Sequence, residues 1–126
     1  MSRIQKVLLV NPYPKTAKTI MEASHLPPVG LAYTASYLES KGVICKIIDA
    51  ALLKLDLNAV LQEIKAFQPE MVGISFNIAT ITETLSLSQT VKGQLGVHVI
   101  LGGPASAGEL QQILEKSKAD CVVRGE

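Results

Sequence analysis

The sequence predicts a single α/β domain, in which five parallel strands form a doubly wound sheet with helices on both faces. Short apolar runs alternate along the chain with longer segments of helical periodicity. These runs are continuous, as expected for parallel strands that are buried on both faces. The 126 residues are enough for one domain with a real core and too few for two ordinary domains. Residues 1–126 are therefore expected to fold as one domain.

Five apolar runs are predicted to be the strands, at residues 6–10, 43–48, 71–77, 97–101 and 121–123. The third run, MVGISFN, should be central, because helical segments flank it on both sides. We prefer the strand order 2-1-3-4-5, with right-handed crossovers and a reversal of winding between strands one and three, over the order 3-2-1-4-5. The alternation of elements fits both orders, so the choice depends on the motifs described below.

Four helices are predicted between the strands, at residues 29–41, 59–67, 81–95 and 107–116. Gly42 and Gly96 directly follow two of these helices and are typical C-terminal caps. Asp56 or Asn58 is expected to cap the start of the second helix. The loop at residues 15–26 is longer than a connection requires, which is typical of functional loops.

Composition and charge exclude several classes of partner. The net charge is +1, so the chain lacks the basic field that nucleic-acid and anionic-membrane binding requires. No apolar run reaches about 18 residues and the first residues lack a signal-peptide pattern, so we expect no membrane association and a cytoplasmic location. Cys45 and Cys121 are far apart in the sequence and are expected to be structural thiols in a reducing compartment. They predict neither a disulfide framework nor a metal cluster.

The motifs of several common α/β proteins are missing from the sequence. NPYPKT follows the first strand, where classical dinucleotide-binding proteins carry G-x-G-x-x-G, and no G-x-x-x-x-G-K-[ST] occurs. Asn11 and Ser75 stand where a phosphoacceptor receiver domain needs acidic residues. Thr16 and Thr19 are faintly similar to a flavodoxin-type flavin loop, without its glycine. No catalytic set can be assembled around the two histidines, so no catalytic residues are expected.

The candidate site lies where the third and fourth strands end. Ser75, Phe76 and Asn77 close the third strand, and Gly102-Gly103 follows the fourth. Ligands of open α/β sheets bind at the carboxyl ends of the strands, near the point where the winding reverses. Two adjacent glycines suggest a backbone that a large ligand approaches closely, although a plain turn is the alternative. Ser75 could likewise simply cap the next helix.

Six segments of the chain together resemble one known family. They are VLLVNPYP, PPVGLAYTASYLESKG, IIDA, PEMVGISF, VILGGPA and CVVRGE. In this order and spacing they resemble the N-terminal cobalamin-binding domain of B12-dependent radical SAM enzymes. The resemblance implies the flavodoxin-like order 2-1-3-4-5, with cobalamin along the carboxyl edge and its nucleotide tail entering beside the sheet.

The B12-binding fold more broadly uses D-x-H-x-x-G before the first helix, a Ser after the third strand and Gly-Gly after the fourth. Ser75 and the glycine pair match the last two elements. When the final glycine of the first motif is aligned on Gly30, His25 stands at the Asp place and Pro27 at the His place. The axial histidine is therefore absent, and the resemblance implies a cobalt without a protein nitrogen beneath it.

Two further elements of the family are absent from these 126 residues. No C-x-x-x-C-x-x-C motif occurs, so the iron–sulfur cluster and S-adenosylmethionine are expected only in a downstream radical SAM domain. A fifth helix after the last strand is also missing, which predicts a truncated domain. Without this helix, part of one sheet face would stay uncovered, so we expect the chain to self-associate.

The resemblance implies a cobalamin-binding module of a methyltransferase-like enzyme, without catalysis by this fragment alone. The alternatives are a flavin-binding electron carrier of the flavodoxin type and a domain that keeps the fold without a ligand. In the cobalamin reading, Ser75 and Thr80 would form hydrogen bonds to the cofactor, and the glycines would give room. The expected cofactor-binding residues are Asn11, Pro12, Leu26, Pro27, Gly30, Ser75, Phe76, Asn77, Thr80, Gly102, Gly103 and Pro104.

Overall fold

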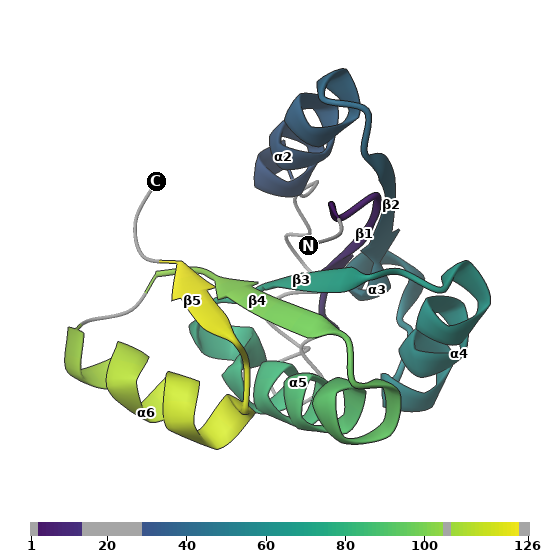
Figure 1. The fold of residues 1–126 in the computed structure, drawn as a ribbon. Helices are drawn as coiled ribbons and strands as arrows, with labels where there is room; N and C mark the ends of the chain where they lie inside the picture. Colours follow the sequence, from purple (N-terminus) through teal and green to yellow (C-terminus); the bar gives the residue numbers. More distant parts are fainter. Residues whose placement is uncertain (1–2, 14–28, 105–106, 124–126) are drawn as a thin grey trace.

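A computed structural model describes residues 3–13, 29–104 and 107–123 and shows a parallel sheet of five strands in the order β2-β1-β3-β4-β5 (Figure 1). The predicted fold class and strand order are confirmed. Each strand lies within two residues of its predicted position at both ends. The strands are β1 (Lys6–Asn11), β2 (Ile44–Asp49), β3 (Met71–Ser75), β4 (His98–Gly102) and β5 (Cys121–Val123).

The helices cover the two faces of the sheet unequally. Helix α2 (Val29–Ser40) lies on one face, where it packs mainly on β1 and β2. The opposite face carries α4 (Leu57–Phe67), α5 (Ile81–Leu95) and α6 (Ala107–Ser117) (Figure 1). Two short helices were not predicted, α3 (Ala50–Leu53) and the 3-10 helix η1 (Ile78–Thr80). In the described parts of the chain, no helix is long and apolar enough to cross a membrane.

Side chains of β1 alternate between two apolar cores. Leu8 and Val10 face the larger core, which lies between the sheet and helices α4, α5 and α6. Val7 and Leu9 face the smaller core, where Ala35 of α2 joins them. Four consecutive buried side chains in one strand require cover on both faces, as the continuous apolar run predicted. The same alternation assigns every residue of the paired strands to one face or the other.

The helix ends follow the local signals of the sequence. Gly42 and Gly96 have φ angles of 86° and 65°, in the left-handed region that glycine tolerates. At the start of α4, the Asp56 Oδ1 atom accepts a hydrogen bond from the Ala59 N–H at 2.9 Å. This identifies Asp56, one of the two predicted candidates, as the N-cap.

Two carboxylates tie the strands together at the amino edge of the sheet. Glu70 accepts hydrogen bonds from the backbone N–H groups of Gln5 and Lys6 at 2.8 and 3.2 Å. Asp120 accepts one from the Val99 N–H at 2.7 Å and pairs with the Lys92 ammonium at 3.0 Å. The hydrogen bond from Val99, with help from Lys92, lowers the pKa of the Asp120 carboxyl. These contacts belong to the fold and lie at the end of the sheet opposite the candidate site.

Candidate functional site

The carboxyl edge of the sheet brings three strand ends into one row. In the parallel register, Ser75 of β3 pairs with Gly102 of β4, and Gly102 pairs with Val123 of β5. Two residues earlier along each strand, Gly73, Ile100 and Cys121 form a second row. The intervening residues, such as Leu101, belong to the larger core on the opposite face. Both rows therefore face the same side as α2.

We call these six residues the open face: Gly73, Ser75, Ile100, Gly102, Cys121 and Val123. Helix α2 packs over β1 and β2, and no other described helix lies on this side of the sheet (Figure 1). Val123 is accordingly 47 % exposed and Cys121 is exposed. The apolar part of the open face is therefore incompletely covered within the described residues.

The two glycines after β4 differ in what surrounds them. A Cβ atom added to Gly102 would meet no heavy atom within 4 Å, so this glycine borders free space on the open face. A Cβ atom added to Gly103 would come within 2.2 Å of the Phe76 carbonyl oxygen. The Phe76 N–H also donates a hydrogen bond to the Gly102 carbonyl at 2.8 Å. Gly103 thus has a structural reason to be glycine, the close approach of the two loops, whereas Gly102 borders free space.

Phe76, Asn77 and Thr80 form the turn between β3 and α5. Asn77 caps η1, because its side chain accepts a hydrogen bond from the Ala79 N–H at 2.8 Å. The Thr80 hydroxyl accepts one in return from the Asn77 N–H at 2.9 Å, and Thr80 is only 2 % exposed. The Phe76 side chain is 3 % exposed and belongs to the larger core. These three side chains therefore serve the fold, and of the predicted group on β3 only Ser75 faces the open side.

Asn11 is also engaged within the protein. Its Nδ2 group donates a hydrogen bond to the Asp49 Oδ1 atom at 3.0 Å, which links the ends of β1 and β2. The same oxygen accepts a hydrogen bond from the Leu52 N–H at 3.2 Å and caps α3. Asn11 therefore holds the carboxyl edge in shape, whichever ligand binds there.

Of the remaining residues that the sequence predicted to bind or lie near the cofactor, some are exposed and others lie outside the described residues. Gly30 is exposed near the start of α2, and Pro104 is exposed just beyond the glycine pair. Leu26, Pro27 and His25 lie outside the described residues. Their proposed contacts with a cofactor stay predictions.

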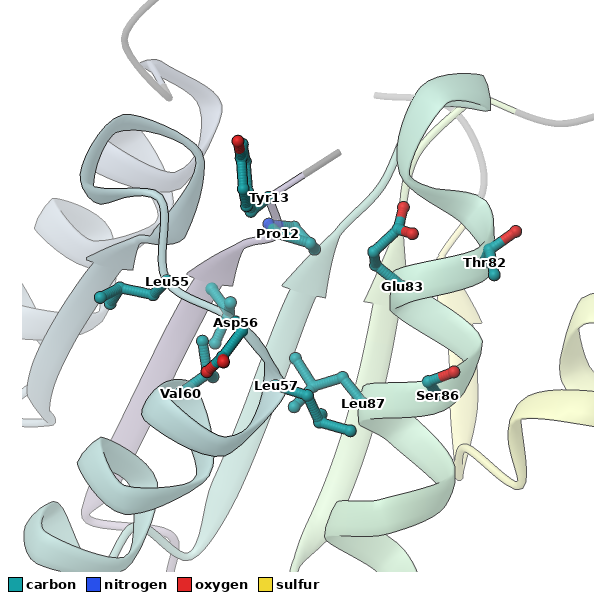
Figure 2. Close-up of a pocket in the computed structure, with 11 residues that line it drawn as sticks. Pro12, Tyr13, Leu55, Asp56, Leu57, Val60, Thr82, Glu83, Ser86 and Leu87 are labelled. Carbon is teal, nitrogen blue, oxygen red and sulfur yellow. The ribbon is translucent and has the colours of Figure 1, made fainter. Parts of the chain in front are cut away.

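A pocket that the sequence reasoning missed lies on the other face of the same edge, between α4 and α5 (Figure 2). Its volume is about 200 Å³. Pro12 is the one predicted site residue among those that line it. No motif marks this pocket, because its walls are ordinary core and helix residues that meet only in the folded chain. The lining residues are Val10, Pro12, Tyr13, Leu55, Asp56, Leu57, Val60, Thr82, Glu83, Ser86 and Leu87.

Metal-binding and reactive-thiol chemistry find little support in the described residues. Within residues 3–13, 29–104 and 107–123, no three His, Cys, Asp or Glu side chains are grouped so that they could hold a metal ion. Burial, and secondarily the charge of Glu39, raises the pKa of the Cys45 thiol. A raised pKa keeps this thiol protonated and poorly nucleophilic at neutral pH.

Comparison with solved structures identifies the fold. A receiver domain of a signal transduction histidine kinase from Syntrophus aciditrophicus aligns with a TM-score of 0.66 at 14 % identity, over 95 % of this chain and 77 % of that one. The receiver domain of RstA from Klebsiella pneumoniae gives a TM-score of 0.63 at 15 % identity, over 95 % of this chain and 85 % of that one. At such low identity, the similarity concerns the flavodoxin-like fold alone.

Sequence comparison identifies the family. An uncharacterised methyltransferase of Pyrococcus horikoshii is 30 % identical over 126 residues, which are 98 % of this chain. The chain spans 27 % of the length of that relative. The sequence profile of the B12 binding domain matches residues 22–126. This match includes β3, β4 and β5 and with them all six residues of the open face, and the chain therefore belongs to the B12-binding domain family.

Proposed function

We propose that this chain is a cobalamin-binding module and that the open face receives the nucleotide tail of the cofactor. One structural observation carries the placement. The row Ser75–Gly102–Val123 lies at the carboxyl edge, and Gly102 there borders unfilled space. A long cofactor tail needs such a surface beside the sheet, and the family match makes cobalamin the cofactor in question.

The open face offers apolar surface for the aromatic base of the nucleotide tail and one hydroxyl group for its polar part. Ile100 and Val123 supply apolar contact, and burial of such side chains contributes about 25 cal/mol per Å². The Ser75 hydroxyl can donate or accept a hydrogen bond. When bound, cobalamin would supply a cobalt centre that carries a methyl group. The chain's own residues would bind and orient the cofactor and keep water from one side of it.

We further propose that the complete protein joins this module to a downstream radical SAM domain. The methyltransferase from Pyrococcus horikoshii supports a larger protein, because the present chain corresponds to 27 % of its length. The iron–sulfur cluster and S-adenosylmethionine would bind in that further domain, and this module alone would not catalyse methyl transfer. A C-x-x-x-C-x-x-C motif in the rest of the coding sequence is the expected finding. Its absence would refute the radical SAM partner and leave cobalamin binding to be judged separately.

Titration of hydroxocobalamin into the purified 126-residue chain tests the central proposal. We expect saturable binding with a cobalamin visible spectrum in the protein fraction. Replacement of Gly102 by Leu should weaken binding by about tenfold or more, because the side chain would occupy the space beside the cofactor. Gly93→Leu is the matched control, since Gly93 is exposed on α5 and also has no heavy atom near its added Cβ.

The outcomes separate the three candidate functions. Equal affinity of the Gly102→Leu variant and the control would refute the open face as the site. A flavin spectrum in protein purified from cells, with no cobalamin uptake, would favour the flavodoxin-type carrier. A chain that stays colourless with both cofactors would be a domain that keeps the fold without the ligand.

A further inference from the structure

The pocket between α4 and α5 is separate from the open face. The sheet lies between them, because the pocket is lined by residues of α4 and α5, and these helices lie on the face of the sheet opposite α2 (Figure 1). Pro12 and Tyr13 enclose the pocket at the end of β1, and Leu57 of α4 and Leu87 of α5 lie on its other sides (Figure 2). A ligand of this pocket would therefore be distinct from a ligand of the open face.

Glu83 gives this pocket an unusual chemical character. Its Oε1 atom is buried and has no hydrogen-bond partner in the structure. Figure 2 shows the carboxylate on the side of α5 that faces Pro12 and Tyr13. A buried carboxylate oxygen without a donor is costly, and a charge-assisted hydrogen bond is the strongest means to offset this cost. An acidic residue in the first turn of a helix is favoured by the helix dipole, but the dipole does not require one of its carboxylate oxygens to be buried.

The rest of the lining restricts the ligand further. The described lining residues include no Lys or Arg that could neutralise Glu83, and Asp56 adds a second carboxylate at the start of α4. Most of the other walls are aliphatic, from Val10, Leu57 and Leu87 among others. The volume of about 200 Å³ lies below the range of roughly 300–1,000 Å³ that is usual for drug-sized ligands. The pocket therefore suits a short apolar chain with one positive charge.

We propose that this pocket binds a small primary alkylammonium ion, whose charge pairs with Glu83 and whose chain packs between Leu57 and Leu87. The proposal does not depend on cobalamin, since the two sites lie on different faces of the sheet. The ammonium group would donate a hydrogen bond to the Oε1 atom that lacks a partner. The hydrocarbon chain would replace water along the aliphatic walls.

A matched series of three probes tests charge and shape separately. Each of n-pentylammonium, 1-pentanol and pentanoate is titrated into the ¹⁵N-labelled 126-residue chain without cobalamin, and amide chemical shifts are recorded. We expect saturable shifts for n-pentylammonium, centred on the first turns of α4 and α5. The affinity for 1-pentanol should be lower by at least about tenfold, and pentanoate should not bind.

Two variants complete the test. Glu83→Gln keeps the shape of the side chain and removes its charge, and should weaken n-pentylammonium binding by about tenfold or more. Glu39→Gln is the control and should leave binding unchanged, because Glu39 is exposed on α2, on the other side of the sheet. Equal binding of n-pentylammonium and 1-pentanol, or no saturable shift at the pocket, would overturn the proposal even if Glu83→Gln disturbed the fold. Unchanged affinity in a folded Glu83→Gln variant would overturn it as well.

Discussion

At the scale of single residues, the glycine pair after β4 shows how one motif can contain two different constraints. Gly102 lies beside open space, whereas Gly103 lies against the backbone of Phe76. A sequence reading assigns both glycines to the ligand, because a Gly-Gly motif contains no information about which residue touches the neighbouring loop. The three-dimensional neighbours separate the two roles.

Gly103→Ala should therefore reduce the free energy of unfolding by about 1–3 kcal/mol, because the added methyl group would overlap the Phe76 carbonyl and force the loops apart. Urea unfolding followed by circular dichroism measures this change. Gly102→Ala is the control and should alter stability by less than about 0.5 kcal/mol. Similar destabilisation of the two variants would contradict the distinction between the glycines.

Asp120 makes stability depend on pH at the opposite edge. Its folded-state pKa lies below the ordinary value of 3.8, first because of the hydrogen bond from the Val99 N–H and then because of Lys92. The stabilisation is therefore fully present above about pH 4 and is lost as the pH falls through the lowered folded-state pKa. The side chain is 39 % exposed, so solvent screening keeps the effect small.

Asp120→Asn should consequently lower the melting temperature at pH 7 and make little difference near pH 2. Asparagine can still accept the hydrogen bond from Val99, but it lacks the charge that attracts Lys92. Differential scanning calorimetry of both proteins between pH 2 and pH 7 gives the comparison. A difference in melting temperature that is the same at all these pH values would show that the carboxylate charge is not responsible.

At the scale of elements, local signals predicted what depends on local chemistry. The continuous apolar runs gave the strands, and Gly42, Gly96 and Asp56 marked helix ends that the structure shares. Helices α3 and η1 escaped notice because each is one turn long and is stabilised by a tertiary or cap contact. Asp49 caps α3 while it also binds Asn11, and Asn77 forms a capping box with Thr80. Such short elements have no periodicity to read.

The candidate site was predicted only in part for a similar reason. Strand order and the carboxyl edge follow from the α/β pattern, so Ser75 and Gly102 were correctly expected to be neighbours. The orientation of side chains in the turn after β3 depends on which hydrogen bonds the turn adopts. Thr80 and Phe76 therefore lie inside the fold although they are close in the sequence to Ser75, which lies on the open face. The pocket beside Glu83 required the packing of α4 against α5, which no motif encodes.

The position of β4 in the sheet limits which histidine could be the lower axial ligand of the cobalt in a bound cobalamin. His98 is the first residue of β4, so it lies at the amino edge, a strand length of about 15 Å from the carboxyl edge. It therefore cannot act as the axial ligand of a cobalamin at the carboxyl edge. His25 is the other histidine, and it lies outside the described residues.

We predict that the cob(II)alamin complex has no protein nitrogen on its cobalt. Electron paramagnetic resonance should show a spectrum without nitrogen superhyperfine splitting from histidine, and His25→Ala should not change it. His98→Ala serves as the control from the distant edge. A three-line nitrogen pattern that disappears in His25→Ala alone would contradict the prediction and identify His25 as the axial ligand.

At the scale of the whole molecule, the unequal cover of the two sheet faces is the feature with the largest consequence. Among the residues that the structure describes, α4, α5 and α6 cover one face, and α2 covers only the β1 and β2 side of the other (Figure 1). Val123 lies on the open face and on the last strand of the sheet, with 47 % of its surface exposed. Burial of about 400 Å² of apolar surface at ~25 cal/mol per Å² is worth on the order of 10 kcal/mol. A burial free energy of this size favours binding of a ligand or of a second copy of the chain to the open face.

We therefore predict that the 126-residue chain self-associates through the open face. Light scattering at about 100 μM should report a mass above that of the monomer. Val123→Glu should restore the monomer, because a charge within the contact would be costly to bury. Leu52→Glu is the matched control, since Leu52 is 60 % exposed on α3, away from the open face, and should not alter association. A clean monomer at about 100 μM without cobalamin would contradict self-association.

Saturating hydroxocobalamin should compete with self-association and produce monomers, because the cofactor tail and the second copy would use the same surface. A dimer that cobalamin leaves intact would show that the cofactor and the second copy do not share the open face.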